Sequence, residues 1–198
     1  MTHHEAARRD DLPDLRPATR FDAALREVPS DPAILSHGVE RAHAMLAAAR
    51  YRDDAASIVR MLGYLGNAYR ILGYADEAVA VLTEAVEQAR AAGDQRAALA
   101  NRIRLGEALK YQGDIAQAER LFREAARVAQ HTDLGDYRDF ALQHLGKCRL
   151  EQGDAAEAVP LLEQALALRH DKGDPDLIAS TTSALVLART TLEQQMND

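Results

Sequence analysis

The same five landmarks occur three times along this chain at a constant spacing of forty residues. They are a Leu-Gly pair, a second Gly, an Ala, a large apolar residue and a second Ala. Such self-similarity is the signature of a repeat architecture, in which each copy stacks on the next. The first copy has Leu65-Gly66, Gly73, Ala78, Leu82 and Ala85; the later copies have Leu105-Gly106, Gly113, Ala118, Phe122 and Ala125, then Leu145-Gly146, Gly153, Ala158, Leu162 and Ala165.

Each copy has the pattern of two helices joined by a tight turn. Apolar residues in the first half recur at helical spacing, so they form one stripe. In the first copy these are Leu62, Leu65, Tyr69 and Leu72. The second Gly then follows the last apolar residue, where a left-handed residue ends a helix. An Asp stands at or beside the next helix start, where it can cap free amides; these are Asp76, Asp114 and Asp154. We therefore predict an all-α chain of at least seven helices in antiparallel pairs, with no sheet.

The Gly of each Leu-Gly pair falls inside a helix, where Gly costs about 1 kcal/mol relative to Ala. We expect a close approach of the partner helix to offset this cost. The expected contacts are with Ala78, Ala118 and Ala158.

The composition limits the classes of function. The formal charge of −7 and the sequence pI near 5.5 argue against a dedicated nucleic-acid binder or a protein of anionic membranes. Cys148 is the one cysteine, so no intrachain disulfide can form. No apolar run is long enough to span a bilayer, and the N-terminus lacks an apolar signal core. We expect a soluble cytoplasmic protein.

The landmarks also divide the chain. Residues 1–18 are charged and contain Pro13 and Pro17, so we expect a disordered leader there. Residues 19–198 are predicted to form one array. It comprises a degenerate repeat at 19–54, full repeats at 55–94, 95–134 and 135–174, and a C-terminal capping helix at 175–198. The degenerate repeat is expected to begin with a short helix over Thr19–Val28, with Phe21, Ala24, Leu25 and Val28 on one face.

The order of landmarks resembles that of the tetratricopeptide repeat. The family's usual period is 34 residues, with an early Trp and a closing Pro, and this chain departs from all three. It is similar to the extended repeats of about forty residues in bacterial regulatory and signalling proteins. The resemblance covers residues 36–195. It implies a right-handed α-solenoid, a superhelix whose first helices line a concave groove that binds peptides or protein segments. It implies no reaction.

The family's ligand-facing positions identify candidate groove residues. Together with neighbouring positions they include five Arg or Lys and two Glu, despite the net negative charge. The alternative is that these are ordinary solvated helix faces. The carboxylate clamp of chaperone-binding relatives is matched only at Asn67, which argues against a chaperone tail as ligand. The candidates are Arg60, Tyr64, Asn67, Arg70, Arg104, Glu107, Lys110, Tyr111, Phe140, Gln143, His144 and Lys147.

We therefore predict a protein interaction module that binds an acidic or amphipathic segment of a partner, without enzymatic activity or cofactor. One alternative is a stand-alone regulator that senses a short peptide. Another is a self-associating scaffold, such as a homodimer, formed through Leu185 and Leu187. His144 and Cys148 lie one helical turn apart but provide only two of the ligands that zinc needs. We expect no metal, a packed Cys148 thiol and a His144 at the surface.

Overall fold

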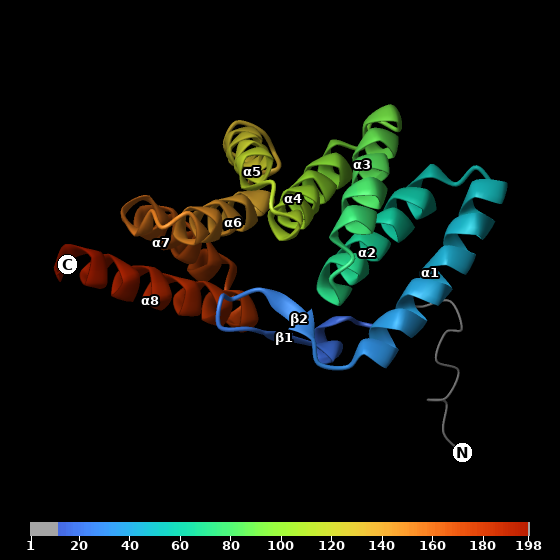
Figure 1. Cartoon of the computed structure of the whole chain (residues 1–198). Coiled ribbons are helices and arrows are strands. Elements are labelled where there is room, and N and C mark those ends of the chain that lie inside the picture. The colour runs from blue at the N-terminus through green and yellow to red at the C-terminus, as the bar shows by residue number, and fades with distance from the viewer. Residues whose placement is uncertain (1–11, 198) are drawn as a thin grey trace, which may run out of the picture.

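The computed structural model describes residues 12–197, which contain eight α-helices (Figure 1). Two short 3-10 turns lie at Arg16–Ala18 and Gly135–Tyr137, and two strands, β1 (Thr19–Phe21) and β2 (Glu27–Pro29), precede the helices. The helices are α1 (Pro32–Tyr51), α2 (Ala55–Leu72), α3 (Ala75–Ala91), α4 (Gln95–Gln112), α5 (Ile115–Gln130), α6 (Arg138–Glu151), α7 (Ala155–Lys172) and α8 (Pro175–Asn197).

Helix boundaries follow the Gly and Asp signals. Gly73 and Gly113 end α2 and α4 with φ of 88° and 100°, a left-handed conformation that strains residues with a Cβ. The Asp114 and Asp154 carboxylates accept hydrogen bonds from free amides at the starts of α5 and α7. These local signals make each connection short, so each helix folds back on the previous one.

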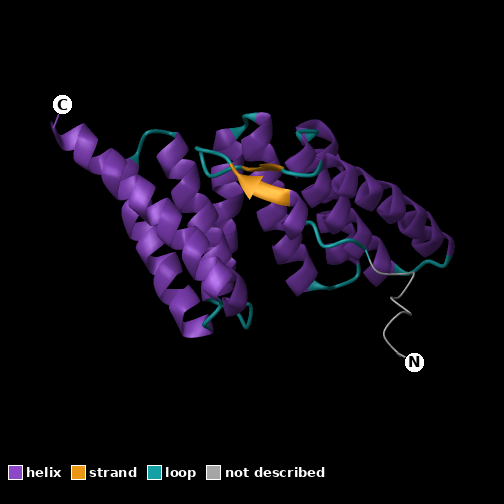
Figure 2. Ribbon diagram, turned by 90° about the horizontal axis from the view of Figure 1, so that it is seen from below, coloured by secondary structure: helices purple, strands orange, loops and turns teal. Residues whose placement is uncertain are grey.

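Successive helices pack in antiparallel pairs and fan out in an arc. Helices α2, α4, α6 and α8 lie toward the inner side, and α3, α5 and α7 lie toward the outer side (Figures 1 and 2). Within residues 12–197 the one strand pairing is β1 with β2, and none falls between Asp54 and Asp174. The prediction of an all-α solenoid is confirmed for the repeat array.

The mid-helix glycines lie closest to the large apolar landmark of the second helix; the expected Ala is among the three nearest neighbours only at Gly146, where the Ala158 carbonyl oxygen would lie 3.3 Å from a Cβ. A Cβ on Gly106 would lie 2.6 Å from Cε1 of Phe122, and one on Gly66 would lie 2.2 Å from Cγ of Leu82. Ala118 is fully buried, but it is not the nearest neighbour of Gly106. The expectation of a close approach holds, and its contact residue is corrected from Ala to the large residue four positions later.

The N-terminal segment differs most from the sequence prediction. Residues 19–29 form an antiparallel β-hairpin, with Arg20 opposite Val28, so the short helix expected over Thr19–Val28 is wrong. A helix of ten residues has little stability of its own, and contacts with distant helices favour the extended form. Disorder was expected up to residue 18, but Leu15 and Ala18 are buried in the core. Residues 1–11, the rest of that leader, lie outside the described part.

The C-terminal helix α8 covers the last repeat. Leu185 is 5% exposed and packs with Leu162 and Ala184, so it cannot supply the apolar surface for self-association that we expected, whereas Leu187 is half-buried. None of the helices in residues 12–197 has the length and apolar character of a membrane span.

Candidate functional site

Two adjoining hollows on the inner face of the solenoid contain residues of the N-terminal segment in their walls. The first, the hairpin cavity, has a volume of about 720 Å³ and lies between the hairpin and helices α2, α4, α6 and α8. The second, the α2–α4 channel, has a volume of about 1010 Å³ and lies beside residues 12–16. Ten of the twelve predicted groove residues line one hollow or both; Lys110 and Tyr111 line neither.

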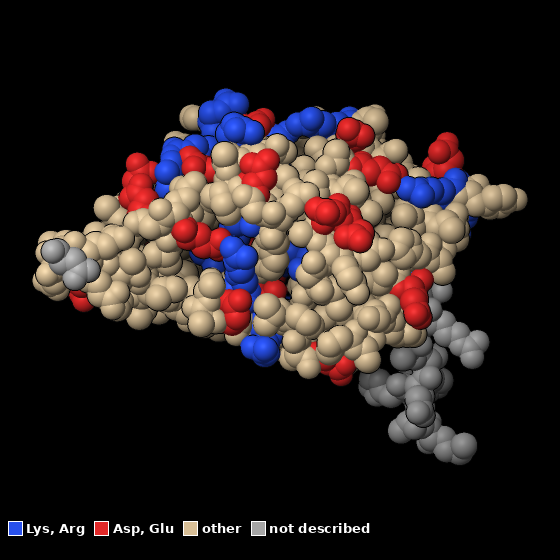
Figure 3. Space-filling model, viewed as in Figure 1, with Lys and Arg blue, Asp and Glu red and all other residues tan. Residues whose placement is uncertain are grey.

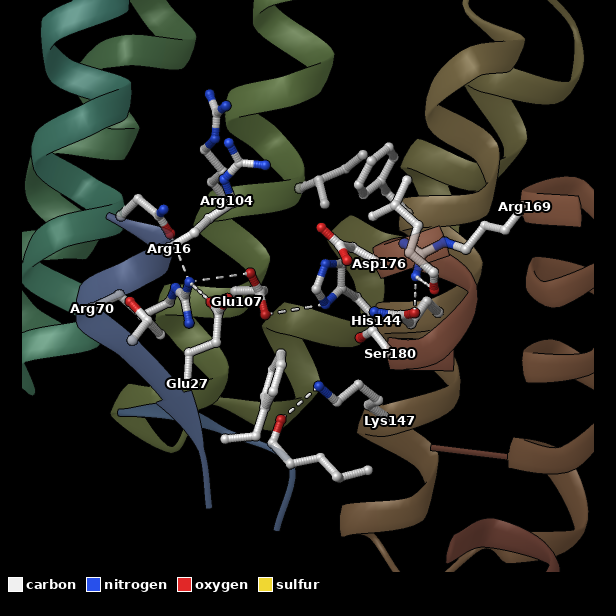
Figure 4. Close-up of a pocket in the computed structure, with 18 of the residues that line it drawn as sticks. Arg16, Glu27, Arg70, Arg104, Glu107, His144, Lys147, Arg169, Asp176 and Ser180 are labelled. Atoms are coloured by element: carbon white, nitrogen blue, oxygen red, sulfur yellow. Dashed lines mark hydrogen bonds and ion pairs between the residues drawn. The ribbon is translucent and has the colours of Figure 1, made fainter. Parts of the chain in front are cut away.

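The hairpin lies on this inner face and is held there by charged residues. The Glu27 carboxylate on β2 pairs with the guanidinium of Arg70, which is 2% exposed. Arg70 also lies 3.7 Å from Glu107, whose carboxylate is 3.1 Å from Nδ1 of His144 (Figure 4). A row of paired charges therefore links the hairpin to α2, α4 and α6.

A second set of charges holds the neighbouring hairpin residue. Arg26 donates to the Glu151 carboxylate at 2.7 Å, and Lys110 donates to the other oxygen of that carboxylate at 2.8 Å. Adjacent hairpin residues of opposite charge, Arg26 and Glu27, thus meet Glu151 and Arg70, each of the complementary sign. This pairing gives the hairpin a defined orientation on the inner face.

Backbone contacts complete the hairpin's attachment. The Tyr111 hydroxyl accepts a hydrogen bond of 2.6 Å from the Glu27 amide and donates one of 3.3 Å to its carbonyl. The Arg26 and Arg70 guanidinium groups lie 5.4 and 5.0 Å from the centre of the Tyr111 ring. The Tyr111 hydroxyl therefore contacts the peptide groups of Glu27 and not its side chain.

Leu25 anchors the tip of the hairpin. Its φ is 57°, a left-handed conformation in which a non-Gly residue is strained by roughly 1–2 kcal/mol. Its side chain packs beside the apolar cluster of Leu162, Ala184 and Leu185, and its carbonyl accepts a hydrogen bond from Lys147. These contacts explain why a strained Leu stands at a turn position that favours Gly.

Burial and pairing determine the charge states of the site. Burial lowers the pKa of Arg70, but Glu107 and Glu27 outweigh that effect, so the pKa lies above its ordinary value. Burial raises the pKa of Glu107, but Arg70 and His144 outweigh it and hold the pKa well below the usual range. Burial lowers the pKa of His144, partly opposed by Glu107. The row therefore carries a cationic Arg70, an anionic Glu107 and a neutral His144 near neutral pH.

The predicted groove residues divide into accessible and engaged groups. Arg60 and Arg104 are exposed, Arg60 on the α2–α4 channel and Arg104 on both hollows. Tyr64 donates to the Pro13 carbonyl, and burial raises its pKa to about 12. Gln143 is buried and accepts hydrogen bonds from Arg169 and Thr181. Several of the predicted groove residues are therefore already engaged in hydrogen bonds within the chain.

His144 corrects a further expectation. It was predicted at the surface, but its side chain is 12% exposed and stacks on Phe122 with ring centres 5.5 Å apart. Cys148 is buried as predicted, and burial raises its thiol pKa to about 11, which keeps it protonated and unreactive. Among residues 12–197 no group of three or more His, Cys, Asp or Glu side chains is arranged to hold a metal.

Sequence reasoning missed the hairpin residues Leu25, Arg26 and Glu27 as part of the site. Their helical spacing favoured the wrong secondary structure, and the residues they contact lie more than forty positions away. The one available signal was the length of the expected helix, which is below what an isolated helix needs.

Charged side chains gather in a recess near the middle of the molecule. Figure 3 shows Lys and Arg side chains in this recess with Asp and Glu side chains beside them, and both signs of charge over the surrounding surface. A recess partly excludes water, so each charge there interacts more strongly than on an open surface.

This geometry defines an α-solenoid of helix pairs with a polar inner face. Two family models, both described as tetratricopeptide repeat, match residues 57–131 and 141–176. These parts of the chain are thus tetratricopeptide repeats. No curated protein sequence matches the chain.

Solved structures with the same fold include two helical-repeat proteins. One is a putative kinesin light chain from Podosopora anserina with nearly identical TPR-like repeats. Its sequence is 21% identical to this chain, and the structures superpose with a TM-score of 0.63 over 83% of this chain and 82% of that one. The other is BtubC (BKLC) from P. vanneervenii, with an identity of 19%, a TM-score of 0.62 and coverage of 82% and 76%. At these identities the similarity shows the fold alone.

Proposed function

We propose that this chain is a protein interaction module whose concave face binds an extended segment of a partner protein, and that the N-terminal hairpin occupies this face until the partner displaces it. The observation that carries the proposal is the pair of ion pairs that Arg26 and Glu27 form with Glu151 and Arg70, respectively. A surface that binds an extended strand of its own chain has the donors and acceptors to bind one from another chain.

The chemistry of the hairpin's contacts specifies the partner segment. Arg70 forms an ion pair with a carboxylate, Lys147 donates a hydrogen bond to a backbone carbonyl, and Tyr111 hydrogen-bonds to one peptide group. Arg60 and Arg104 lie in the adjoining channel without a carboxylate at ion-pair distance among the described residues, so they can attract further acidic side chains. We therefore propose an extended segment with a net negative charge.

The hairpin is held loosely enough to exchange. Its Arg26 and Glu27 side chains remain 35% and 33% exposed, so solvent reaches the hairpin side of both ion pairs, whose partners Glu151 and Arg70 are 17% and 2% exposed. Phe21 is 50% exposed, so only part of its apolar surface is buried when the hairpin packs on the inner face. A partner segment that adds contacts with Arg60 and Arg104 can therefore compete.

The hairpin's own sequence provides a defined probe. A labelled peptide of residues 17–31 should bind the Arg26→Ala, Glu27→Ala double variant about tenfold more tightly than the wild-type chain, because the variant's hairpin has lost both charge pairs. Fluorescence anisotropy measures this difference. A peptide carrying the same two alanines is the matched control and should bind neither chain well. If both peptides bind equally, or if neither binds the double variant, the inner face does not bind extended segments through these charge pairs, and the proposal is wrong.

A further inference from the structure

The hairpin cavity has the size and lining of a site for a small molecule. Its volume of about 720 Å³ lies within the range of roughly 300–1000 Å³ that is typical of ligand pockets. Apolar side chains form much of its wall, and charged groups stand among them (Figure 4). The apolar wall residues are Phe21, Leu25, Ile103, Phe140 and Leu177.

Lys147 is a buried cation in this wall. It is 7% exposed, and its ammonium makes one hydrogen bond, of 2.6 Å, to the Leu25 carbonyl; the same nitrogen lies 5.4 Å from the centre of the Phe21 ring. Within residues 12–197 no carboxylate lies at ion-pair distance from it. An ammonium has three donors, so two remain for a ligand. A buried charge without a counter-ion is costly unless something pairs with it.

Arg104 adds a second cation from α4. Its Nη1 donates a hydrogen bond to the Asn101 side chain at 3.0 Å. Among residues 12–197, no carboxylate lies at ion-pair distance from its guanidinium. Although the residue as a whole is exposed, desolvation of the Arg104 guanidinium by the surrounding protein lowers its pKa, and burial lowers the pKa of Lys147 to about 8. Both shifts have the direction expected for cations that lack an anionic partner.

The other charged groups of the cavity already have opposite charges beside them. Glu27 and Glu107 pair with Arg70, and Arg169 pairs with Asp139. Arg16 pairs with Asp14, and its pKa is raised first by Asp14 and further by Asp176. The cavity is therefore left with an excess of positive charge at Lys147 and Arg104.

We infer that the hairpin cavity binds a small amphipathic organic anion, with its acidic group on Lys147 and its apolar body against Phe21, Ile103 and Phe140. Arg104 adds attraction from the α4 wall. Because Phe21 and Leu25 belong to the hairpin, an occupied cavity holds the hairpin in place. Such a ligand therefore opposes partner binding, although its own binding does not depend on any partner.

A pair of fluorescent probes tests the site in the full-length chain. Anilinonaphthalene sulfonate has an aromatic body and one negative charge, whereas phenylnaphthylamine has the same rings without the charge. We expect about one bound sulfonate per chain, with affinity about fivefold or more weaker in Arg104→Gln. The matched variant Arg60→Gln, on an exposed cation that lines only the other hollow, should bind like wild type, and the neutral probe should not distinguish the three chains.

The pH dependence of probe binding tests Lys147 separately. The charged groups that face it are Glu27 on β2, Arg70 on α2, Glu107 and Lys110 on α4, and the neutral His144 on its own helix. With a pKa of about 8, Lys147 loses its charge between about pH 7 and 9, so sulfonate affinity should fall about tenfold over this interval. Lys147→Arg should remove this fall. Equal binding by Arg104→Gln and Arg60→Gln, several weak sulfonate sites, or a pH profile unchanged in Lys147→Arg would overturn the assignment.

Discussion

The ammonium of Lys147 donates a hydrogen bond of 2.6 Å to the carbonyl oxygen of Leu25, which lies 122 positions earlier in the chain. This contact joins the tip of the N-terminal hairpin to helix α6 in the third full repeat. The hairpin therefore spans the inner face from α2 to α6, as Figure 2 shows from below. The concave face of this solenoid is occupied by its own chain.

The Leu25 side chain should control how long the hairpin stays in its seat. In Leu25→Gly the left-handed strain is relieved, but the apolar anchor beside Leu162 is lost. We expect faster hydrogen exchange at the Arg20 and Val28 amides, by about tenfold, with little change in melting temperature. Ala24→Gly is the matched control, because it loosens the same turn and keeps the anchor. Faster exchange in the control than in Leu25→Gly would contradict the anchoring role.

Gly106→Leu should destabilise the fold by about 2 kcal/mol or more, although Leu favours a helix over Gly. The reason is the fully buried Phe122, whose ring would lie 2.6 Å from the new Cβ. Urea unfolding measures the loss. Phe122→Ala alone should also destabilise, by about 3–5 kcal/mol. The double variant should lose clearly less than the sum of the two, because the new side chain fills the vacated space. Simple additivity would show that the two positions do not share this contact.

Stability should fall as the pH is lowered below about 6.5, the ordinary pKa of His. His144 has a lowered pKa in the fold, so the unfolded chain takes up its proton first, and the unfolded state gains stability as the pH falls. Glu107 has a lowered pKa too, so its contribution is present above its unfolded pKa and is lost under more acidic conditions. In His144→Gln the stability curve should be flatter between about pH 6.5 and 5.5. An unchanged slope in that interval would show that another group causes the acid sensitivity.

The repeat array could be predicted from the sequence because its signals are local. Gly73 and Gly113 mark helix ends, Asp114 and Asp154 mark helix starts, and the structure has its boundaries there. The hairpin could not be predicted, because its conformation depends on residues outside its own segment. Leu25 adopts a conformation that favours Gly only because its side chain and carbonyl are held by distant helices.

The candidate site was partly accessible to sequence reasoning. The forty-residue spacing predicted that equivalent positions of stacked repeats lie side by side, which makes Lys110 the equivalent of Arg70, and Lys147 the equivalent of Glu107. Spacing does not reveal whether such a cation is free or paired. Arg70 and Lys110 are 2% and 1% exposed and are paired with Glu27 and Glu151. The pairing of Arg70 with Glu27 depends on the hairpin, whose position the repeat pattern does not contain.

We propose that the partner protein binds the concave face and not the convex face. Capture of partners from the source cells by the immobilised chain tests it with two charge-reversed variants. Arg60→Glu with Arg104→Glu changes two exposed residues of the concave face that hold no hairpin contact. Arg90→Glu with Arg127→Glu changes two exposed residues on the outer helices α3 and α5.

Both variants change the net charge by the same amount, from −7 to −11, so a general charge effect would act on both alike. We expect the Arg60, Arg104 variant to lose the captured partner and to keep the wild-type melting curve, while the Arg90, Arg127 variant captures the partner as wild type does. Loss of capture in the Arg90, Arg127 variant, with full capture in the Arg60, Arg104 variant, would show that the outer helices, not the concave face, bind the partner.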